Sequence, residues 1–273
     1  MPTRGPDRER YLPAASAPVR FDNPAAFASR TMNAAPTEID MRKLLSVATL
    51  CLVTSSAFAL SEKPYITQAD IDIASLLPSP PTETSPAGQL DLQIVKDLQK
   101  NLTPERAKAI RGDLPQDVYT IAGPVLGPTF TKEKFPLTGE FIAKIVKDAG
   151  FGVGPIKQRY MKARPFKYSA ELATAFDDIA KSTGGATYPS GHSTTAFEVA
   201  LVLGSMLPTK RDALYERAYT YSIHRVTSGA AYPSDAEGGH MAATLAVSEM
   251  MKKPEFRADY EAVKAELDKG GFN

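Results

Sequence analysis

The chain has 273 residues, of which 43% are hydrophobic and 23% are charged, and its formal net charge is +1. Such a composition is typical of a globular protein with a sizeable core, and the balanced charge argues against nucleic acid or an anionic membrane surface as a partner. The single Cys excludes a disulfide framework and a Cys-rich zinc site, and the three His residues leave little room for a His-based metal cluster.

The first 59 residues have the features of material that precedes a folded domain. Residues 1–40 are rich in Ala, Pro, Arg and Asp without apolar periodicity, which indicates an over-extended or disordered N-terminal segment. Residues 41–43 are Met-Arg-Lys, a short apolar run follows, and residues 57–59 are Ala-Phe-Ala, which together form the three parts of a secretory signal peptide. The run is shorter than the ~20 residues of a membrane-spanning helix. We therefore expect a signal peptide at 41–59 and a periplasmic or secreted protein with no membrane span after cleavage.

The rest of the chain divides into a proline-rich stretch and a helical domain. Residues 60–90 contain Leu-Leu-Pro-Ser-Pro-Pro, and we expect them to run extended over the surface, because proline fixes φ and donates no hydrogen bond. Beyond them apolar residues recur at helical spacing, and no hairpin signal or internal repeat appears. Residues 91–273 are therefore predicted to form one all-α domain. The helical pattern is clearest in residues 90–98, 103–111, 141–149, 196–207, 241–250 and 256–267.

The first cluster that could carry chemistry is the basic stretch at residues 157–165. Lys157 and Arg164 are seven residues apart, so on one helix they would point the same way, at an end that Pro165 terminates. Two cations on one face form an anion clamp, and the planar fork of Arg suits a phosphate. Basic residues on a solvated helix face are the alternative interpretation.

The second cluster is Tyr-Pro-Ser-Gly-His-Ser at residues 188–193, directly before an apolar helix. Ser190, Gly191 and His192 would offer an anion the backbone N–H groups of a helix N-terminus, and the glycine permits close approach. His192 would lie beside the anion with a pKa suited to proton transfer. An ordinary N-cap turn with a surface His is the alternative.

The third cluster, at residues 224–235, adds a further cation and a carboxylate. Arg225 precedes a turn of small residues, and Asp235 follows ten positions later at the start of another helical stretch. A plain helix–loop–helix joint is the alternative here.

In this order and spacing the three clusters resemble the signature of the type 2 phosphatidic acid phosphatase superfamily: Lys-x6-Arg-Pro, Pro-Ser-Gly-His and Ser-Arg-x5-His-x3-Asp. Residues 157–165 and 189–192 match the first two parts in full. The proline-rich stretch, the signal peptide and the length are similar to soluble bacterial class A acid phosphatases. The resemblance spans roughly residues 61–250 and implies a single-domain helical bundle of the acid phosphatase and vanadate haloperoxidase type.

The resemblance also implies roles for the matched residues. His192 would protonate the leaving alcohol of a small-molecule phosphoester. No metal and no cofactor are implied, because three cations and a helix N-terminus already supply the positive charge. The residues that would hold the phosphoryl oxygens are Lys157, Arg164, Ser190, Gly191 and Arg225.

The third part of the signature departs from the family at the residue that matters most. The position of the His that would accept the phosphoryl group is Ala231, and the Asp that would orient that His, Asp235, has nothing to orient. Alanine has no lone pair, so no phosphohistidine forms at this position. A haloperoxidase would need the same His to ligate its vanadium.

Other residues are poor substitutes for the missing nucleophile. His240 lies nine residues beyond Ala231, about 13 Å along a helix, and His224 adjoins Arg225, where neighbouring helical side chains diverge. Thr227 and Ser228 are weaker candidates still, and direct attack by water is a further route.

Three explanations stay open: an inactivated form, a natural phosphoester-binding relative, or a relative with other chemistry. The function expected from the sequence is therefore that of a secreted acid phosphatase-type phosphomonoester hydrolase. Its activity would be weak or abolished, because Ala231 stands at the position of the nucleophilic His. The alternatives are a non-catalytic phosphate- or phosphoester-binding protein and a family member with different chemistry. The sequence leaves the oligomeric state open.

Overall fold

The computed structural model of the protein describes residues 59–272, and within that range it contains helices and no strand. The all-α class expected from the sequence is confirmed. None of the helices in this range is long and apolar enough to cross a membrane. In chain order they are α1 (Ile73–Leu76), α2 (Pro86–Lys100), α3 (Pro104–Gly112), α4 (Val118–Leu126), α5 (Pro136–Tyr160), α6 (Pro165–Tyr168), the 3-10 helix η1 (Ala170–Phe176), α7 (Asp177–Ser182), α8 (Gly191–Met206), the 3-10 helix η2 (Pro208–Lys210), α9 (Arg211–Thr227), α10 (Pro233–Met250) and α11 (Pro254–Lys269).

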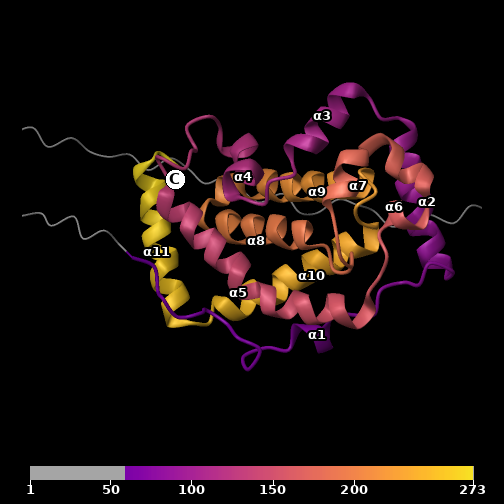
Figure 1. The fold of residues 1–273 in the computed structure, drawn as a ribbon. Coiled ribbons are helices and arrows are strands. Elements are labelled where there is room, and N and C mark those ends of the chain that lie inside the picture. Colours follow the sequence, from indigo (N-terminus) through magenta and orange to yellow (C-terminus); the bar gives the residue numbers. More distant parts are fainter. Residues whose placement is uncertain (1–58, 273) are drawn as a thin grey trace, which may run out of the picture. The chain divides into compact units, whose positions relative to one another are not determined.

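Helix α8 forms the centre of the core. It is apolar on nearly every face, with Val199 and Leu203 fully buried, and this all-round pattern is typical of a helix enclosed by others. Its main neighbours are α9 and α10, and α5 and α4 also contact it (Figure 1). Phe141 and Ile145 of α5 contribute to the same core cluster. The N-terminus of α8 is thereby held at a fixed place among four other helices.

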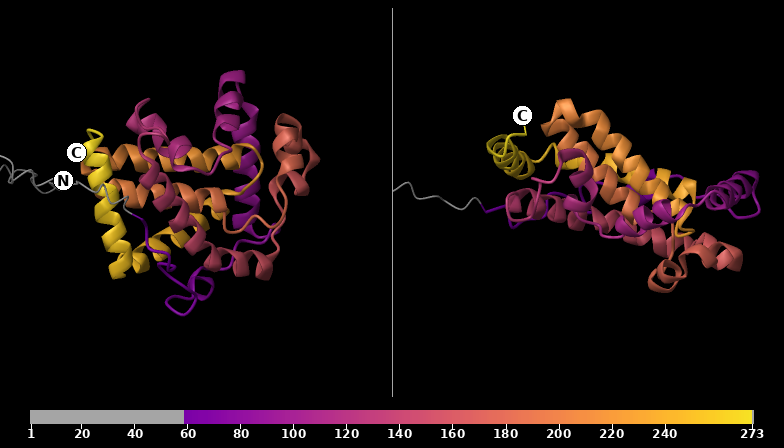
Figure 2. Two further views of the ribbon diagram at one scale, coloured as in Figure 1. Left: turned by 60° about the vertical axis from the view of Figure 1, so that its left-hand side comes forward. Right: turned by 90° about the horizontal axis from the view of Figure 1, so that it is seen from above.

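Other helices lie at the two ends of α8 and α9. Helix α11 crosses one end, while α2 and the α6–α7 region lie at the other, as the views from three directions agree (Figures 1 and 2). Phe256 of α11 packs against Phe141, with ring centroids 5.2 Å apart. The α6–α7 end is the one toward which the N-terminus of α8 points (Figure 1).

The proline-rich stretch at 60–90 is only partly the extended surface segment that its composition predicts. Tyr65, Ile73 and Leu77 are buried in the main core, and residues 73–76 form α1. The Tyr65 backbone N–H donates to Asp148 of α5 at 2.9 Å, and its ring meets Phe256 edge-on. Helix α2 already starts at Pro86. The stretch therefore covers α5 and α11 instead of linking the domain to something else.

The N-terminal predictions concern a part of the chain that the structure does not describe. The segment at 1–40 and the signal peptide at 41–59, apart from Ala59, lie outside the described residues.

The turn between α9 and α10 brings the third sequence cluster back toward α6. Gly229 has φ +71°, a conformation that glycine adopts without steric cost, and its N–H donates to the Val226 carbonyl at 2.9 Å. The Gly229 carbonyl accepts from the N–H of Phe166 in α6, at 3.2 Å. The turn is thus fixed to the segment that follows α5, which places the first and third clusters side by side.

Candidate functional site

A cavity of about 200 Å³ lies at the N-terminus of α8, and all three sequence clusters contribute to its wall. Among the residues that the structure describes, no carboxylate lines it. Its lining residues are Gln116, Lys157, Arg164, Thr183, Thr187, Ser190, Gly191, His192, Arg225, Ala230 and Ala231.

Lys157 and Arg164 meet at this cavity, but they do not share a helix face as the spacing predicted. Helix α5 ends at Tyr160, and Met161 follows with φ +44°, so the chain turns before Arg164, which is the N-cap residue of α6. The prediction failed because residues 157–164 are good helix formers, so no local signal marks the end at Tyr160. The two cations converge through this turn.

Backbone carbonyls hold both side chains in place. The Lys157 ammonium donates to the carbonyls of Ala186, Thr187 and Pro189, at 3.1, 3.2 and 2.6 Å. The Arg164 guanidinium donates from Nη1 to the Ala230 carbonyl at 2.6 Å. Neutral carbonyls orient a cation without cancelling its charge, so the cavity keeps a positive potential.

The N-terminus of α8 supplies the donors that the sequence predicted. Ser190 is the N-cap residue, and its Oγ accepts hydrogen bonds from the backbone N–H and the hydroxyl of Ser193, at 3.3 and 3.0 Å. Its own hydroxyl hydrogen is therefore directed elsewhere. The N–H groups of Gly191 and His192, which precede the capped N–H of Ser193, have no partner inside the helix, and both residues line the cavity.

Arg225 is the residue of the cavity wall whose surroundings would best suit an anion. Its side chain belongs to α9, is only 3% exposed, and carries an Nη1 group with no hydrogen-bond partner among the described residues. Burying an unpaired cationic donor destabilises a protein, so such groups concentrate at binding and catalytic sites.

Mutual repulsion and burial shift the pKa values of these cations downward. Burial, with a smaller contribution from Arg164, lowers the pKa of Lys157 to about 8. Burial and the same Arg164 lower the pKa of Arg225 to about 10. A dianion in the cavity would relieve both effects, because it favours the charged form of every neighbouring cation.

His192 is held by the connector between α3 and α4. Its Nε2 lies 3.1 Å from the carbonyl oxygen of Leu114. A carbonyl only accepts, so Nε2 carries hydrogen, and the titrating nitrogen is Nδ1. Burial and then the charge of Arg225 lower the pKa of His192 to about 3. Burial beside these cations thus favours the neutral imidazole.

Asp235 is not the partnerless carboxylate that the sequence suggested. It is fully buried, and it pairs with the Lys162 ammonium at 2.9 Å. The Tyr232 backbone N–H and the Thr187 hydroxyl both donate to its Oδ2, at 2.8 and 2.7 Å. Lys162 lies within the first cluster, yet its role depends on a contact across 73 residues, which spacing alone does not show.

The remaining candidates fall at different places. Ala231 lines the cavity, 2% exposed, as the spacing predicted. His224 points away, with Nδ1 2.6 Å from Asp113, and lines a different cleft together with Arg217. His240 stacks on Phe197, with centroids 3.8 Å apart, and does not line the cavity. Neither histidine lines the cavity beside Ala231.

Three cavity residues escaped the sequence analysis. Thr187 stands two positions before the Pro-Ser-Gly-His motif, so a search of its flanks for hydroxyl groups would have found it. Gln116 and Thr183 carry no local signal, because tertiary packing alone brings their segments to the cavity.

Comparison with known proteins agrees with this arrangement. Residues 141–258 match the model of the PAP2 superfamily. This chain thus contains a PAP2 superfamily domain. A non-specific acid phosphatase of Providencia stuartii is 27% identical over 245 residues, which are 84% of this chain and 99% of that protein. A non-specific acid phosphatase of Salmonella typhi is 24% identical, over 83% of this chain and 92% of its own. An acid phosphatase of Zymomonas mobilis is 26% identical over half of this chain.

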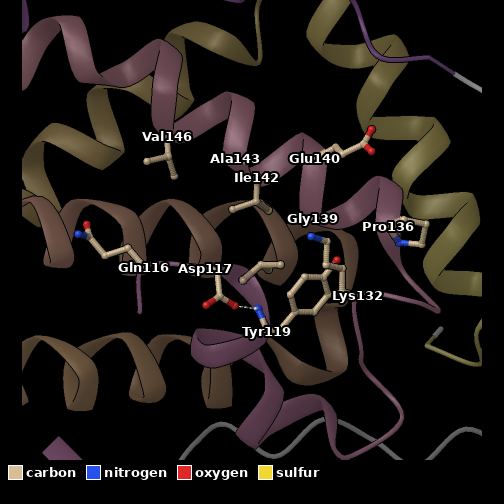
Figure 3. Close-up of a pocket in the computed structure, with 11 residues that line it drawn as sticks. Gln116, Asp117, Tyr119, Lys132, Pro136, Gly139, Glu140, Ile142, Ala143 and Val146 are labelled. Atoms are coloured by element: carbon tan, nitrogen blue, oxygen red, sulfur yellow. Dashed lines mark hydrogen bonds between the residues drawn. The ribbon is translucent and has the colours of Figure 1, made fainter. Parts of the chain in front are cut away.

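The PAP2 match runs from α5 to the start of α11 and contains every cationic residue of the cavity. Gln116 lies outside it, on the connector before α4. Figure 3 shows a second cleft, of about 530 Å³, between the start of α4 and α5, where Gln116 also forms part of the wall. Asp117 borders this cleft and caps α4 through the Tyr119 N–H at 2.9 Å. Gln116 therefore lines both the cavity at the N-terminus of α8 and this second cleft.

Proposed function

We propose that this PAP2 protein hydrolyses phosphomonoesters and binds the phosphoryl group of a small-molecule substrate in the cavity at the N-terminus of α8. The observation that carries the proposal is Arg225, which lines a cavity with two more cations and whose buried Nη1 has no hydrogen-bond partner among the described residues. The names of the acid phosphatases to which the chain is similar support a phosphatase-type activity.

Each group of the cavity has a place in this reaction. Arg225 supplies the unpaired donor for a phosphoryl oxygen, and Lys157 and Arg164 neutralise charge at fixed positions. The Ser190 hydroxyl and the N–H groups of Gly191 and His192 donate to the remaining oxygens. Charge that accumulates in the transition state of phosphoryl transfer is stabilised best by such preorganised groups.

His192 is the proposed general acid. Its Nδ1 gains a proton when a phosphoryl dianion enters, because the dianion offsets the cations that lower its pKa. The protonated Nδ1 then gives that proton to the leaving alcohol. The rate at saturating substrate accordingly falls as the pH rises through the pKa of His192 in the complex.

The proposal extends to the cell compartment and the chain's organisation. A signal peptide at 41–59 would deliver an all-α domain at 91–273, covered by residues 60–90, to the periplasm or the exterior. A phosphatase there would act on phosphoesters that do not cross the inner membrane.

Ala231 supports a second candidate, a protein that binds phosphate or phosphoesters with little turnover. Its methyl group lines the cavity where the resemblance places a nucleophilic His. Loss of a covalent nucleophile costs catalysis, whereas the cations and the helix N-terminus retain binding and part of the rate.

Hydrolysis of p-nitrophenyl phosphate by the full chain at mildly acidic pH tests the proposal. We expect turnover that Arg225→Gln abolishes and Ala231→His increases. Turnover only in Ala231→His would mean that the natural chain is a binder, provided that it binds inorganic phosphate. Absence of both turnover and phosphate binding in all forms would reject the cavity as a phosphoryl site.

A further inference from the structure

Ala231 stands where the family signature has its nucleophilic His, and the structure offers another route for attack on phosphorus. This inference rests on the proposed hydrolysis of phosphomonoesters. Asp235, which the signature pairs with a His, is fully buried and does not line the cavity. It cannot receive a proton from the cavity directly.

Thr187 connects the cavity with the buried Asp235. Its side chain lines the cavity, and its hydroxyl donates to Oδ2 of Asp235 at 2.7 Å. The same Oγ lies 3.2 Å from the carbonyl oxygen of Ala230, the neighbour of Ala231. Among the hydroxyl groups that line the cavity, this one is bonded to a carboxylate, and the lone pairs of its oxygen can accept a further hydrogen bond.

The threonine is fixed on both sides. Its backbone N–H donates to the Lys162 carbonyl at 3.0 Å, and its carbonyl accepts from the Lys157 ammonium at 3.2 Å. The ammonium of Lys162 pairs with Asp235, so the carboxylate that receives the Thr187 hydroxyl is itself anchored. One rigid unit therefore joins a phosphoryl-binding cation, a hydroxyl and a buried carboxylate.

We propose that water attacks the phosphorus directly in this protein, and that Thr187 relays the proton of that water to Asp235. The water oxygen bonds to phosphorus while the bond from phosphorus to the alcohol oxygen breaks. The water gives a proton to Oγ of Thr187, whose own proton passes to Oδ2 of Asp235. His192 gives a proton from Nδ1 to the alcohol. Asp235 then returns its proton through Thr187 to the phosphate, which leaves as the monoanion, and His192 takes up a new proton from solvent when the next phosphoryl dianion binds.

The small side chain of Ala231 fits this route. Thr187, Ala230 and Ala231 line the same cavity, and a methyl group at position 231 takes up less of it than the imidazole of a His would, which leaves more room for a water beside Thr187. The reaction then has one displacement and no phosphoenzyme, and a single in-line displacement inverts the configuration at phosphorus.

Substitutions of Thr187 in the full chain test the relay. Thr187→Val keeps the shape and removes the hydroxyl, and we expect kcat for p-nitrophenyl phosphate to fall about a hundredfold or more, with KM little changed. Thr187→Ser keeps the hydroxyl and should retain most of kcat. Thr227→Val is the matched control, because this buried hydroxyl of α9 bonds only to the Ile223 carbonyl. Normal kcat in Thr187→Val would overturn the relay and leave the proposed hydrolysis standing.

The stereochemistry at phosphorus gives a readout that does not depend on how well a variant folds. A p-nitrophenyl phosphorothioate that is chiral through oxygen isotopes should be hydrolysed with inversion by the natural chain, and with retention by Ala231→His. Retention in the natural chain, or an acid-stable phosphoryl group on Thr187, would show a covalent intermediate and overturn the inference. Complete absence of hydrolysis would overturn both this route and the proposed function.

Discussion

At the scale of single residues, the protonation of His192 depends on what occupies the cavity. Its pKa is lowered to about 3 by burial and by the charge of Arg225, and the Leu114 carbonyl opposes this shift only in part. An anion among the three cations raises this pKa, so the protein should take up a proton when the anion binds.

Sulfate is a suitable probe of this coupling, because it does not itself titrate at mildly acidic pH. We expect calorimetry of sulfate binding, in buffers that differ in ionisation enthalpy, to report uptake of up to one proton. His192→Gln should bind sulfate without that uptake. Equal uptake in both proteins would assign the proton to another group and remove the support for His192 as the acid.

Glu198 is a second residue whose protonation should be measurable. It is 1% exposed on α8, neither carboxylate oxygen has a hydrogen-bond partner among the described residues, and burial raises its pKa from 4.5 to about 8. The folded protein holds this proton up to a higher pH than the unfolded chain does. Its contribution to stability is therefore complete below pH 4.5 and is lost as the pH rises toward 8.

Glu198→Gln tests this pH dependence. The substitution keeps the shape and removes the titration, so melting temperatures between pH 4.5 and 8 should fall less steeply than those of the natural chain. The exposed Glu216→Gln on α9 is the control and should leave the slope unchanged. Identical slopes in all three proteins would contradict a protonated Glu198 in the fold.

At the scale of elements, close packing of α10 against the N-terminus of α8 maintains the cavity. Gly239 permits this close packing of the two helices, because a Cβ there would lie 2.6 Å from the Ser190 carbonyl oxygen and 3.0 Å from the Thr194 nitrogen. Both atoms are backbone and cannot rotate away. Any side chain at this position must therefore move the anion-binding turn.

Gly239→Ala should weaken binding of inorganic phosphate and lower the free energy of unfolding by about 1–3 kcal/mol, the usual cost of overpacking. Gly150→Ala is the matched control, since nothing lies within 4 Å of a Cβ at that position in α5. It should instead stabilise the protein by about 0.5–1 kcal/mol without altering phosphate affinity. Unchanged phosphate affinity in Gly239→Ala would show that the turn does not depend on this contact.

The helices were predictable because their signals are local. Apolar spacing marks α8, and Thr103 with Pro104 marks the start of α3, where Thr103 caps the Arg106 N–H. The end of α5 was not predictable, because the chain continues with helix formers and only tertiary packing selects the left-handed Met161. The burial of Tyr65 likewise depends on partners in α5 and α11 that no local pattern reveals.

The same distinction holds for the cavity. Lys157, Ser190 and Arg225 lie in motifs whose chemistry and spacing can be recognised in the sequence, and the structure brings them together. The partners of Asp235 could not be read in that way, because Lys162 and Thr187 reach it from distant segments. A motif thus predicts which groups meet, while the contacts behind them follow from packing.

At the scale of the described domain, the cavity concentrates charge that the fold does not neutralise. Lys157, Arg164 and Arg225 are mostly buried near one another, and burial lowers the pKa of each. Such an arrangement destabilises the protein without ligand, and an anion that binds only the folded state recovers the lost stability. The buried cations that would bind an anion therefore lower the stability of this domain when no anion is bound.

The substitution Arg225→Met tests this effect of a buried cation on stability. Removing the unpaired guanidinium should raise the melting temperature in the absence of anions, because an apolar side chain fills the same buried place without an unmet donor. The natural chain should gain about 2.7 kcal/mol, and hence about 5–10 °C, in phosphate at a hundredfold excess over its Kd. Arg225→Met should lose most of that gain, whereas Arg257→Met on the distant α11 should keep it. An equal gain in the Arg225 and Arg257 variants would mean that phosphate stabilises the domain from some other site, and that the unpaired donor of Arg225 has a different partner.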